Sequence, residues 1–161
     1  MIDRPAQKDL SRGPLIVDEP GRRPDSLLKG ANMSFVDGLN FDEKGLIPAI
    51  IQDHNSGKVL TLCYMNKEAL EKTLKEGKIY LFRRSKGKLM LKGETSGCTQ
   101  AVREVSIDCA DNSILFRVEQ ERAACHEGYF TCYFRKLGPD GSFVVEDERI
   151  FDPKEVYKKG K

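Results

Sequence analysis

The stretch of residues 46–64, LIPAIIQDHNSGKVLTLCY, decides the fold. It holds two short apolar and β-branched runs, 46–52 and 58–64, separated by the triplet 55–57, NSG. Asn, Ser and Gly favour tight turns, so the pattern predicts two strands joined as an antiparallel hairpin. We expect the folded domain to begin just before this hairpin, near Phe35.

Further short elements are predicted after the hairpin. Asn66 is placed to cap a helix that runs through Leu74 and ends at Gly77, because one face of this stretch is apolar and the other is charged. The remaining β-rich runs predict strands over residues 79–82, 88–92, 100–109, 114–118, 129–134 and 143–145, with a short helix after Pro153. The expected fold class is α+β and mostly β: one compact domain of antiparallel strands and hairpins with one or two short helices.

The length of 161 residues fits one domain with short extensions. Residues 1–34 hold four of the seven prolines and no aromatic side chain, so they are expected to form a polar, mobile extension. The core domain is predicted over residues 35–137, and residues 138–161 are predicted as a C-terminal extension.

Charge and hydropathy exclude several classes of function. The 27 Lys and Arg nearly cancel the 25 Asp and Glu, so no strong global field attracts nucleic acid or an acidic membrane. No run approaches the ~20 apolar residues of a membrane helix, and the first 30 residues lack the apolar core of a secretion signal. The odd number of five cysteines argues for free thiols in a reducing cytoplasm.

Three cysteines are candidate metal ligands. Cys109, Cys125 and Cys132 are spaced sixteen and seven residues apart near predicted strand ends. Zinc takes thiolates readily, and three protein ligands with one open position are typical of a catalytic zinc site. Packed apolar cysteines remain an equal alternative, because neither pair has the tight CxxC spacing. His126 follows Cys125 directly and can act as general acid or base, as a fourth ligand, or as a surface residue.

Two neighbouring segments are candidate anion binders. Residues 83–92 carry five cations in ten positions, which suits a phosphorylated small molecule but also a solvated hairpin. The polar loop 92–97 offers hydroxyls and backbone amides, a weak signal by itself. Asp108 and Asp111 flank Cys109 and are candidate magnesium ligands, although acids at strand ends often only shape turns.

Together these stretches resemble the phosphoribosyl-AMP cyclohydrolase family of histidine biosynthesis, whose members open the adenine ring of phosphoribosyl-AMP. The resemblance runs from about residue 38 to 137, and its most specific block is 124–135, ACHEGYFTCYFR. It implies a substrate site formed by the following residues: Arg84, Ser85, Lys92, Glu94, Thr95, Ser96 and Gly97.

The resemblance also implies the metals and the assembly. Zinc, one per subunit, would be bound by Cys109 of one subunit and by Cys125 and Cys132 of its partner, in an obligate homodimer, with His126 as the catalytic residue. The magnesium-binding acids of the family are matched here only by Asp108; the other two positions are Ala110 and Asn112, and Asp111 is a nearby acid that can substitute.

Two other functions are alternatives. A zinc purine or cytidine deaminase shares the attack by activated water, but its signature includes a downstream Pro-Cys-x-x-Cys, which is absent here. A diverged zinc-binding or ligand-binding module without activity is the second alternative, and Ala110 and Asn112 motivate it.

Overall fold

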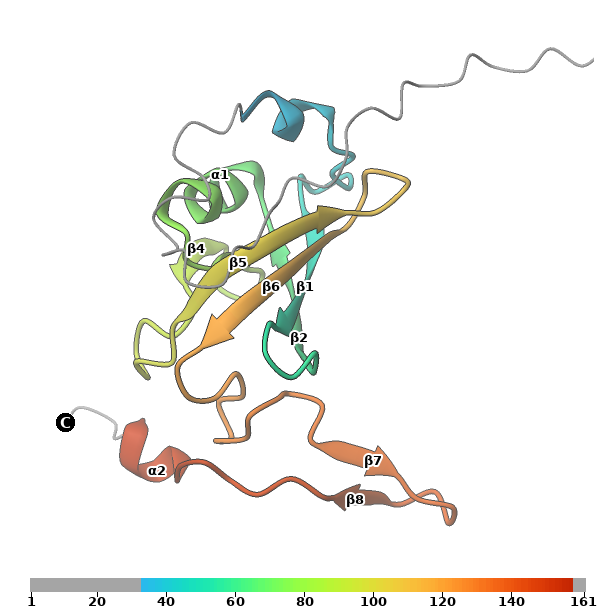
Figure 1. Cartoon of the computed structure of the whole chain (residues 1–161), viewed down its shortest axis with the longest axis vertical. Helices are drawn as coiled ribbons and strands as arrows, with labels where there is room; N and C mark the ends of the chain where they lie inside the picture. Colours follow the sequence, from blue (N-terminus) through green and yellow to red (C-terminus); the bar gives the residue numbers. More distant parts are fainter. Residues whose placement is uncertain (1–32, 158–161) are drawn as a thin grey trace, which may run out of the picture.

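The computed structural model describes residues 33–157, in which a four-stranded sheet forms the centre (Figure 1). The strands lie in the order β2 (Val59–Met65), β1 (Ile47–Asp53), β6 (Ile114–Gln120) and β5 (Gln100–Ile107). The predicted hairpin of β1 and β2 is confirmed. β1 and β6 run parallel, so the expectation of antiparallel pairs alone was wrong here. The chain between these two strands is long enough for the crossover that parallel pairing requires.

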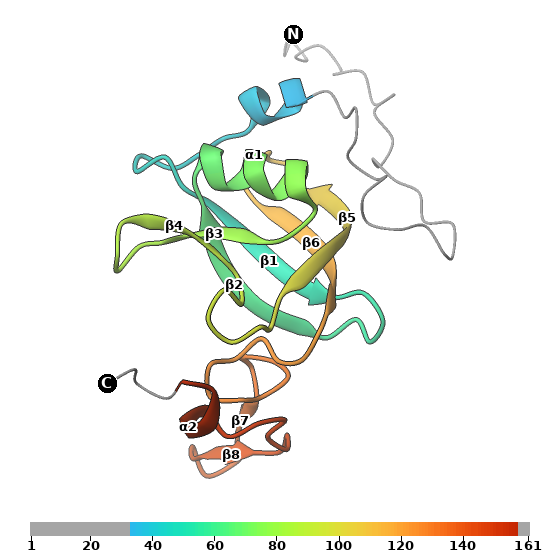
Figure 2. The same cartoon turned by 90° about the vertical axis from the view of Figure 1, so that its left-hand side faces the viewer.

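One helix covers the sheet next to a second hairpin. Helix α1 (Lys67–Glu76) begins at Asn66, whose Oδ1 accepts the Ala69 N–H at 2.9 Å, and it ends at Gly77 in the left-handed conformation, φ 66°. This confirms the predicted helix and both of its boundaries. β3 (Tyr80–Arg83) and β4 (Lys88–Leu91) form the predicted hairpin, which lies beside α1 in Figure 2.

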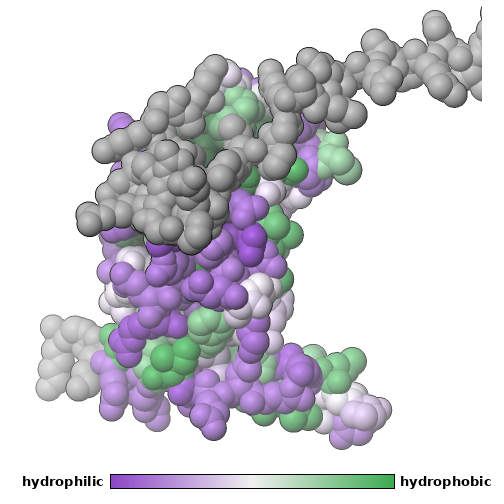
Figure 3. All heavy atoms as spheres, viewed as in Figure 1, coloured by the Kyte–Doolittle hydropathy of each residue, from purple (hydrophilic) through white to green (hydrophobic). Residues whose placement is uncertain are grey.

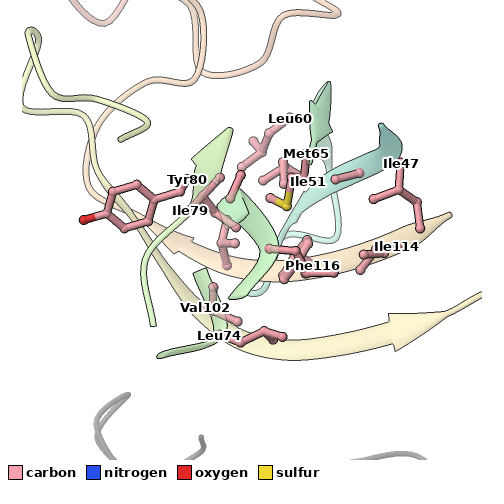
Figure 4. Close-up of a cluster of buried hydrophobic side chains, with 14 of the residues drawn as sticks. Ile47, Ile51, Leu60, Met65, Leu74, Ile79, Tyr80, Val102, Ile114 and Phe116 are labelled. Carbon is pink, nitrogen blue, oxygen red and sulfur yellow. The ribbon is translucent and has the colours of Figure 1, made fainter. Parts of the chain in front are cut away.

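The apolar faces of the sheet and of α1 share one core (Figure 4). Ile47 and Ile51 of β1, Leu60 of β2 and Phe116 of β6 have no exposed surface. Each such side chain contributes roughly 1.5–3 kcal/mol through burial. Val36 also joins this core from the short 3-10 helix η2 (Met33–Gly38), which the sequence pattern did not predict.

Residues 129–134 do not form the predicted strand. Their backbone bonds go elsewhere: Tyr129 and Phe130 carbonyls accept the N–H groups of Cys125 and Ala124 at 3.2 and 3.1 Å. The Cys132 N–H is donated to the carbonyl of Leu60 at 2.8 Å. The chain therefore folds back as a compact loop that docks on the start of β2.

An arm of three short elements follows that loop: β7 (Arg135–Leu137), β8 (Phe143–Val145) and α2 (Pro153–Val156). The last two confirm the predicted strand and helix. The β7–β8 hairpin exposes large apolar side chains, with Leu137 exposed by 69% and Phe143 by 65%, and hydrophobic atoms lie among hydrophilic ones at this end of the molecule (Figure 3). Among residues 33–157 no helix is long and apolar enough to cross a membrane.

Candidate active site

Residues 124–132, which we call the cysteine loop, bring two of the three candidate zinc ligands together. The Cys125 thiol is buried and the exposed Cys132 thiol is close enough to interact with it. Burial raises the pKa of Cys125 and the neighbouring Cys132 adds to this effect, while the Glu127 N–H, which is donated to Cys125 Sγ at 3.4 Å, opposes it. Two adjacent thiols with an amide donor fit a soft cation such as zinc, which stabilises thiolates.

The cysteine loop is fixed to its surroundings by two polar side chains. Lys92 Nζ donates a hydrogen bond to the Ala124 carbonyl at 2.5 Å. Gln120 Nε2 donates to the Phe130 carbonyl at 2.9 Å, and the fully buried Gln100 donates its Nε2 to Gln120 Oε1 at 2.8 Å. The backbone around Cys125 is thus held from both sides before any metal binds.

His126 projects from the cysteine loop into solvent, with 80% of its side chain exposed. Its Nε2 lies 3.2 Å from Glu127 Oε1. Both side chains are largely exposed, so this is a surface contact. His126 therefore stands next to the thiol pair with a free path to a substrate.

Cys109 lies in an exposed turn of residues 108–113, which we call the Cys109 turn. The strand predicted to end at 109 ends at Ile107. Asp108 Oδ1 accepts the N–H groups of Asn112 and Ser113 at 2.8 and 2.9 Å and so closes the turn. Hydrogen bonds from Ser113, with Asn112 contributing less, hold the pKa of Asp108 below its ordinary value.

Strand β6 separates the Cys109 turn from the cysteine loop. The turn precedes Ile114, where β6 begins, and the loop follows Gln120, where it ends (Figure 1). Seven residues of extended strand span roughly 20 Å. Accordingly, no three His, Cys, Asp or Glu side chains of residues 33–157 gather closely enough to hold a metal.

The candidate substrate residues lie on the β3–β4 hairpin and on the loop after it. Arg84 is exposed, and its guanidinium stacks 3.9 Å from the centre of the Tyr64 ring; Ser85 is exposed beside it. In the loop, Glu94, Thr95 and Gly97 are exposed.

The loop of residues 92–97 is tightly folded. Ser96 Oγ accepts the Cys98 N–H at 3.3 Å, and the Gly97 N–H is donated to the Gly93 carbonyl at 2.8 Å. Gly93 has φ 85°, and a Cβ there would lie 2.3 Å from the Cys98 carbonyl carbon. Since Lys92 at the start of this loop binds Ala124, the candidate substrate loop and the cysteine loop are joined directly.

A cavity of about 320 Å³ lies between β2 and the C-terminal arm. None of the candidate site residues lines it; its wall includes Lys58, Thr131, Tyr133 and Asp147. The Lys58 ammonium and the Asp147 carboxylate lie 3.5 Å apart there. The candidate thiols and His126 thus lie outside this cavity.

Sequence reasoning missed Asn40, Gln100 and Gln120, the side chains that hold the two cysteine-bearing segments. Gln100, which is buried, and Gln120, which is half-buried, stand in strands whose inward positions are otherwise apolar, a signal that could have marked both as polar residues on the core side. Asn40 carries no comparable signal, because its partners lie 70 residues away along the chain.

Known proteins resemble this chain over most of its length. The family model for phosphoribosyl-AMP cyclohydrolase matches residues 61–134. The phosphoribosyl-AMP cyclohydrolase of Chlorobium phaeovibrioides is 47% identical over 131 residues, which cover 81% of this chain and 96% of that protein. The chain belongs to the phosphoribosyl-AMP cyclohydrolase family. The phosphoribosyl-AMP cyclohydrolase of Pelotomaculum thermopropionicum is 50% identical over 124 residues, 77% of this chain and 96% of that protein.

The family match contains the candidate site. Residues 61–134 include the β3–β4 hairpin, the Cys109 turn and the cysteine loop. The alignment with the Chlorobium phaeovibrioides protein spans 131 residues, which is longer than the predicted core domain of residues 35–137. Similarity to the family therefore reaches beyond the predicted core domain into at least one of its two flanking segments.

Proposed function

We propose that this chain hydrolyses phosphoribosyl-AMP, opening the adenine ring to give the formimino-carboxamide imidazole intermediate of histidine biosynthesis. Membership of the cyclohydrolase family supports this activity. The observation that carries the proposal is the pair of neighbouring thiols, Cys125 and Cys132, with the exposed His126 beside them.

Zinc, one per subunit, is the proposed cofactor. Cys125 and Cys132 would hold it together with Cys109, and the fit rests on the adjacent thiols and on the Glu127 amide that favours a thiolate. When bound, zinc supplies Lewis-acid activation of water. Without such activation, the amidine-like carbon of the adenine ring resists attack by water at neutral pH.

His126 is the proposed catalytic residue for proton transfer. Attack of water on the amino-bearing ring carbon must break that carbon's bond to the ring nitrogen that carries the second ribosyl group, so this nitrogen needs a proton. His126 can remove the proton from water and deliver it to the nitrogen, and its Nε2 lies 3.2 Å from Glu127 Oε1. Loss of such a group costs roughly a hundredfold to ten-thousandfold in rate.

The substrate's phosphates are assigned to the β3–β4 hairpin and the loop of residues 92–97. Arg84 offers a two-pronged guanidinium whose plane is held by the Tyr64 ring. Ser85, Thr95 and Ser96 add hydroxyl donors. Lys92 contributes charge near the reaction centre while its ammonium group orients the cysteine loop through Ala124.

A homodimer with shared zinc sites completes this proposal. Cys109 and Cys125 lie at opposite ends of β6, so one chain does not bring them together, whereas a two-fold related copy can place its Cys109 at the cysteine loop. The exposed apolar side chains Leu137 and Phe143 of the β7–β8 hairpin are a surface suited to such a contact. The free state of all five cysteines supports a reducing cytoplasm as its location.

The test follows the ultraviolet absorbance of phosphoribosyl-AMP mixed with zinc-loaded protein. Ring opening changes the purine spectrum. No spectral change at full zinc occupancy would favour the alternative of a zinc-binding module without activity, and release of ammonia would identify a deaminase.

Sharing of the site is tested by mixing Cys109→Ser with Cys125→Ser, which should restore one intact site in each heterodimer. Mixing Cys125→Ser with Cys132→Ser is the matched control and should restore none. Failure of the first pair despite verified subunit exchange would contradict a shared site.

A further inference from the structure

We infer that hydrogen bonds donated by Asn40 and accepted by Asp108, and not a magnesium ion, hold the Cys109 turn, so that turnover needs zinc but no magnesium. The inference rests on the proposed function, since it concerns the segment that would supply the third zinc ligand. It departs from the expectation that the family resemblance gives for the acids around Cys109.

The oxygens that remain in the turn do not fit magnesium. This ion needs near-octahedral oxygen ligands, among which carboxylates supply the charge. Positions 110 and 112 are Ala and Asn, which supply no carboxylate. The Asp108 carboxylate already accepts two backbone N–H groups through Oδ1, at 2.8 and 2.9 Å. Only Asp111 is left as a second acid.

The backbone oxygens of the turn are occupied by a single residue from another part of the chain. The Asn40 N–H is donated to the Asp111 carbonyl at 2.7 Å. Asn40 Nδ2 is donated to the Ala110 carbonyl at 2.9 Å. Two carbonyls that could have faced a cation are thereby bound by neutral donors, and the two partners are consecutive residues of the turn.

These bonds fix both neighbours of Cys109. Asp108 on one side is held by the amides across the turn, and Ala110 on the other side is held by Asn40. Asp111 adopts φ 54°, a left-handed conformation that an Asp tolerates and that these bonds maintain. The backbone on both sides of Cys109 is therefore held by protein contacts. Asn40 is a positioning residue for Cys109, acting through the backbone and not on the substrate.

The magnesium part of the inference is tested with manganese as a spectroscopic probe of hard-cation binding. Zinc-loaded wild-type protein should bind no Mn²⁺ at this turn by electron paramagnetic resonance, and added Mg²⁺ should leave its turnover unchanged. The double variant Ala110→Asp with Asn112→Asp should gain a saturable Mn²⁺ signal. Saturable binding by the wild type, or a severalfold rise in its turnover with Mg²⁺, would overturn the inference. If neither the wild type nor the double variant binds Mn²⁺, the loss of a magnesium site cannot be assigned to Ala110 and Asn112, and that part of the inference is refuted.

The positioning part is tested through the metal site. Asn40→Ala removes one exposed hydrogen bond, from Nδ2 to the Ala110 carbonyl, and keeps the backbone one. It should weaken zinc affinity about three- to tenfold and reduce the thiolate charge-transfer absorption of cobalt-substituted protein. Asn40→Gln, which keeps the amide donor, should recover part of this loss. Asn55→Ala, at an exposed asparagine in the β1–β2 turn, is the matched control and should leave both values unchanged.

Zinc affinity of Asn40→Ala equal to that of the wild type would overturn the role of Asn40. Each test includes a reading of metal binding made without substrate: Mn²⁺ binding in the first and zinc affinity in the second. A failure of the proposed hydrolysis and a failure of this inference therefore give different results.

Discussion

Replacing Gln120 by Leu should destabilise the protein and loosen the cysteine loop. Gln100 is fully buried and donates its Nε2 to Gln120 Oε1 at 2.8 Å, while Gln120 Nε2 supports the Phe130 carbonyl at 2.9 Å. Gln120→Leu leaves the buried Gln100 amide without an acceptor, which costs about 1–3 kcal/mol, and removes the Phe130 bond, which costs about 1 kcal/mol. We expect the free energy of unfolding to fall by ~2–4 kcal/mol in total.

The double variant separates this cost from a simple loss of packing. Removing both glutamines leaves no unpaired amide between them, so Gln100→Leu with Gln120→Leu should cost at least about 1 kcal/mol less than the sum of the two single variants. Chemical denaturation of zinc-saturated protein at a fixed protein concentration, followed by circular dichroism, measures all three values. Titration with a chromophoric zinc chelator measures how far the cysteine loop has loosened.

Gln52→Leu is the matched control for this cycle. Gln52 Nε2 donates to the Gly57 carbonyl at 2.8 Å in an exposed position, so its loss should change the free energy of unfolding by less than about 0.5 kcal/mol. If Gln120→Leu costs no more than Gln52→Leu, or if the two core variants add without coupling, the argument from the buried amide is refuted.

Three further predictions concern other parts of the site. Burial raises the pKa of Cys63 to about 12 from 9.0, so the free energy of unfolding should fall as pH rises above 9, by at most ~1.4 kcal/mol per pH unit. A series of denaturation curves at increasing pH measures this slope, and Cys63→Ala should lack the part of the slope that comes from this thiol. Gly128→Ala should unfold the cysteine loop and abolish tight zinc binding in the chelator assay, because φ is 86° and a Cβ would lie 2.1 Å from the Phe151 carbonyl oxygen. Gly87→Ala is the control: its φ is 58° but a Cβ would meet open space, so zinc binding should remain. Arg84→Gln should raise KM roughly ten- to hundredfold with kcat little changed. Steady-state kinetics of Arg83→Gln provide the control, and equal KM values for the two variants would contradict the assignment of the phosphate to Arg84.

The local elements could be predicted because their signals lie within a few residues of each other. Asn66 and Gly77 bound α1 as expected, since a cap needs only the side chain and the first or last turn. The strand expected over 129–134 failed for the opposite reason. Its aromatic and β-branched residues match a strand pattern, but the partners of its backbone are the loop itself and Leu60, 72 residues away from Cys132. Tertiary contacts of this range leave no local periodicity.

The candidate site divides in the same way. The sequence was enough to nominate the cysteines as candidate zinc ligands and His126 as a candidate catalytic residue, because the chemistry available depends on which residue types are present. The arrangement does not: spacing suggested that Cys109 would join the other two thiols, whereas β6 lies between them in one chain. The side chains that hold the thiols, Asn40 and Gln120, belong to pairs that only the folded chain brings together.

The opposite placement of the thiols couples three properties of the proposed enzyme. If each zinc needs Cys109 from one subunit and the cysteine loop of another, then zinc binds the dimer and not the monomer, and its binding free energy adds to that of association. The two segments must then be rigid separately, because neither can be shaped by ligands from its own chain. The hydrogen bonds of Asn40 to the Cys109 turn, and of Lys92 and Gln120 to the cysteine loop, supply that rigidity in each monomer. A zinc site divided between two chains, if the proposal holds, would require this separate rigidity of its two halves.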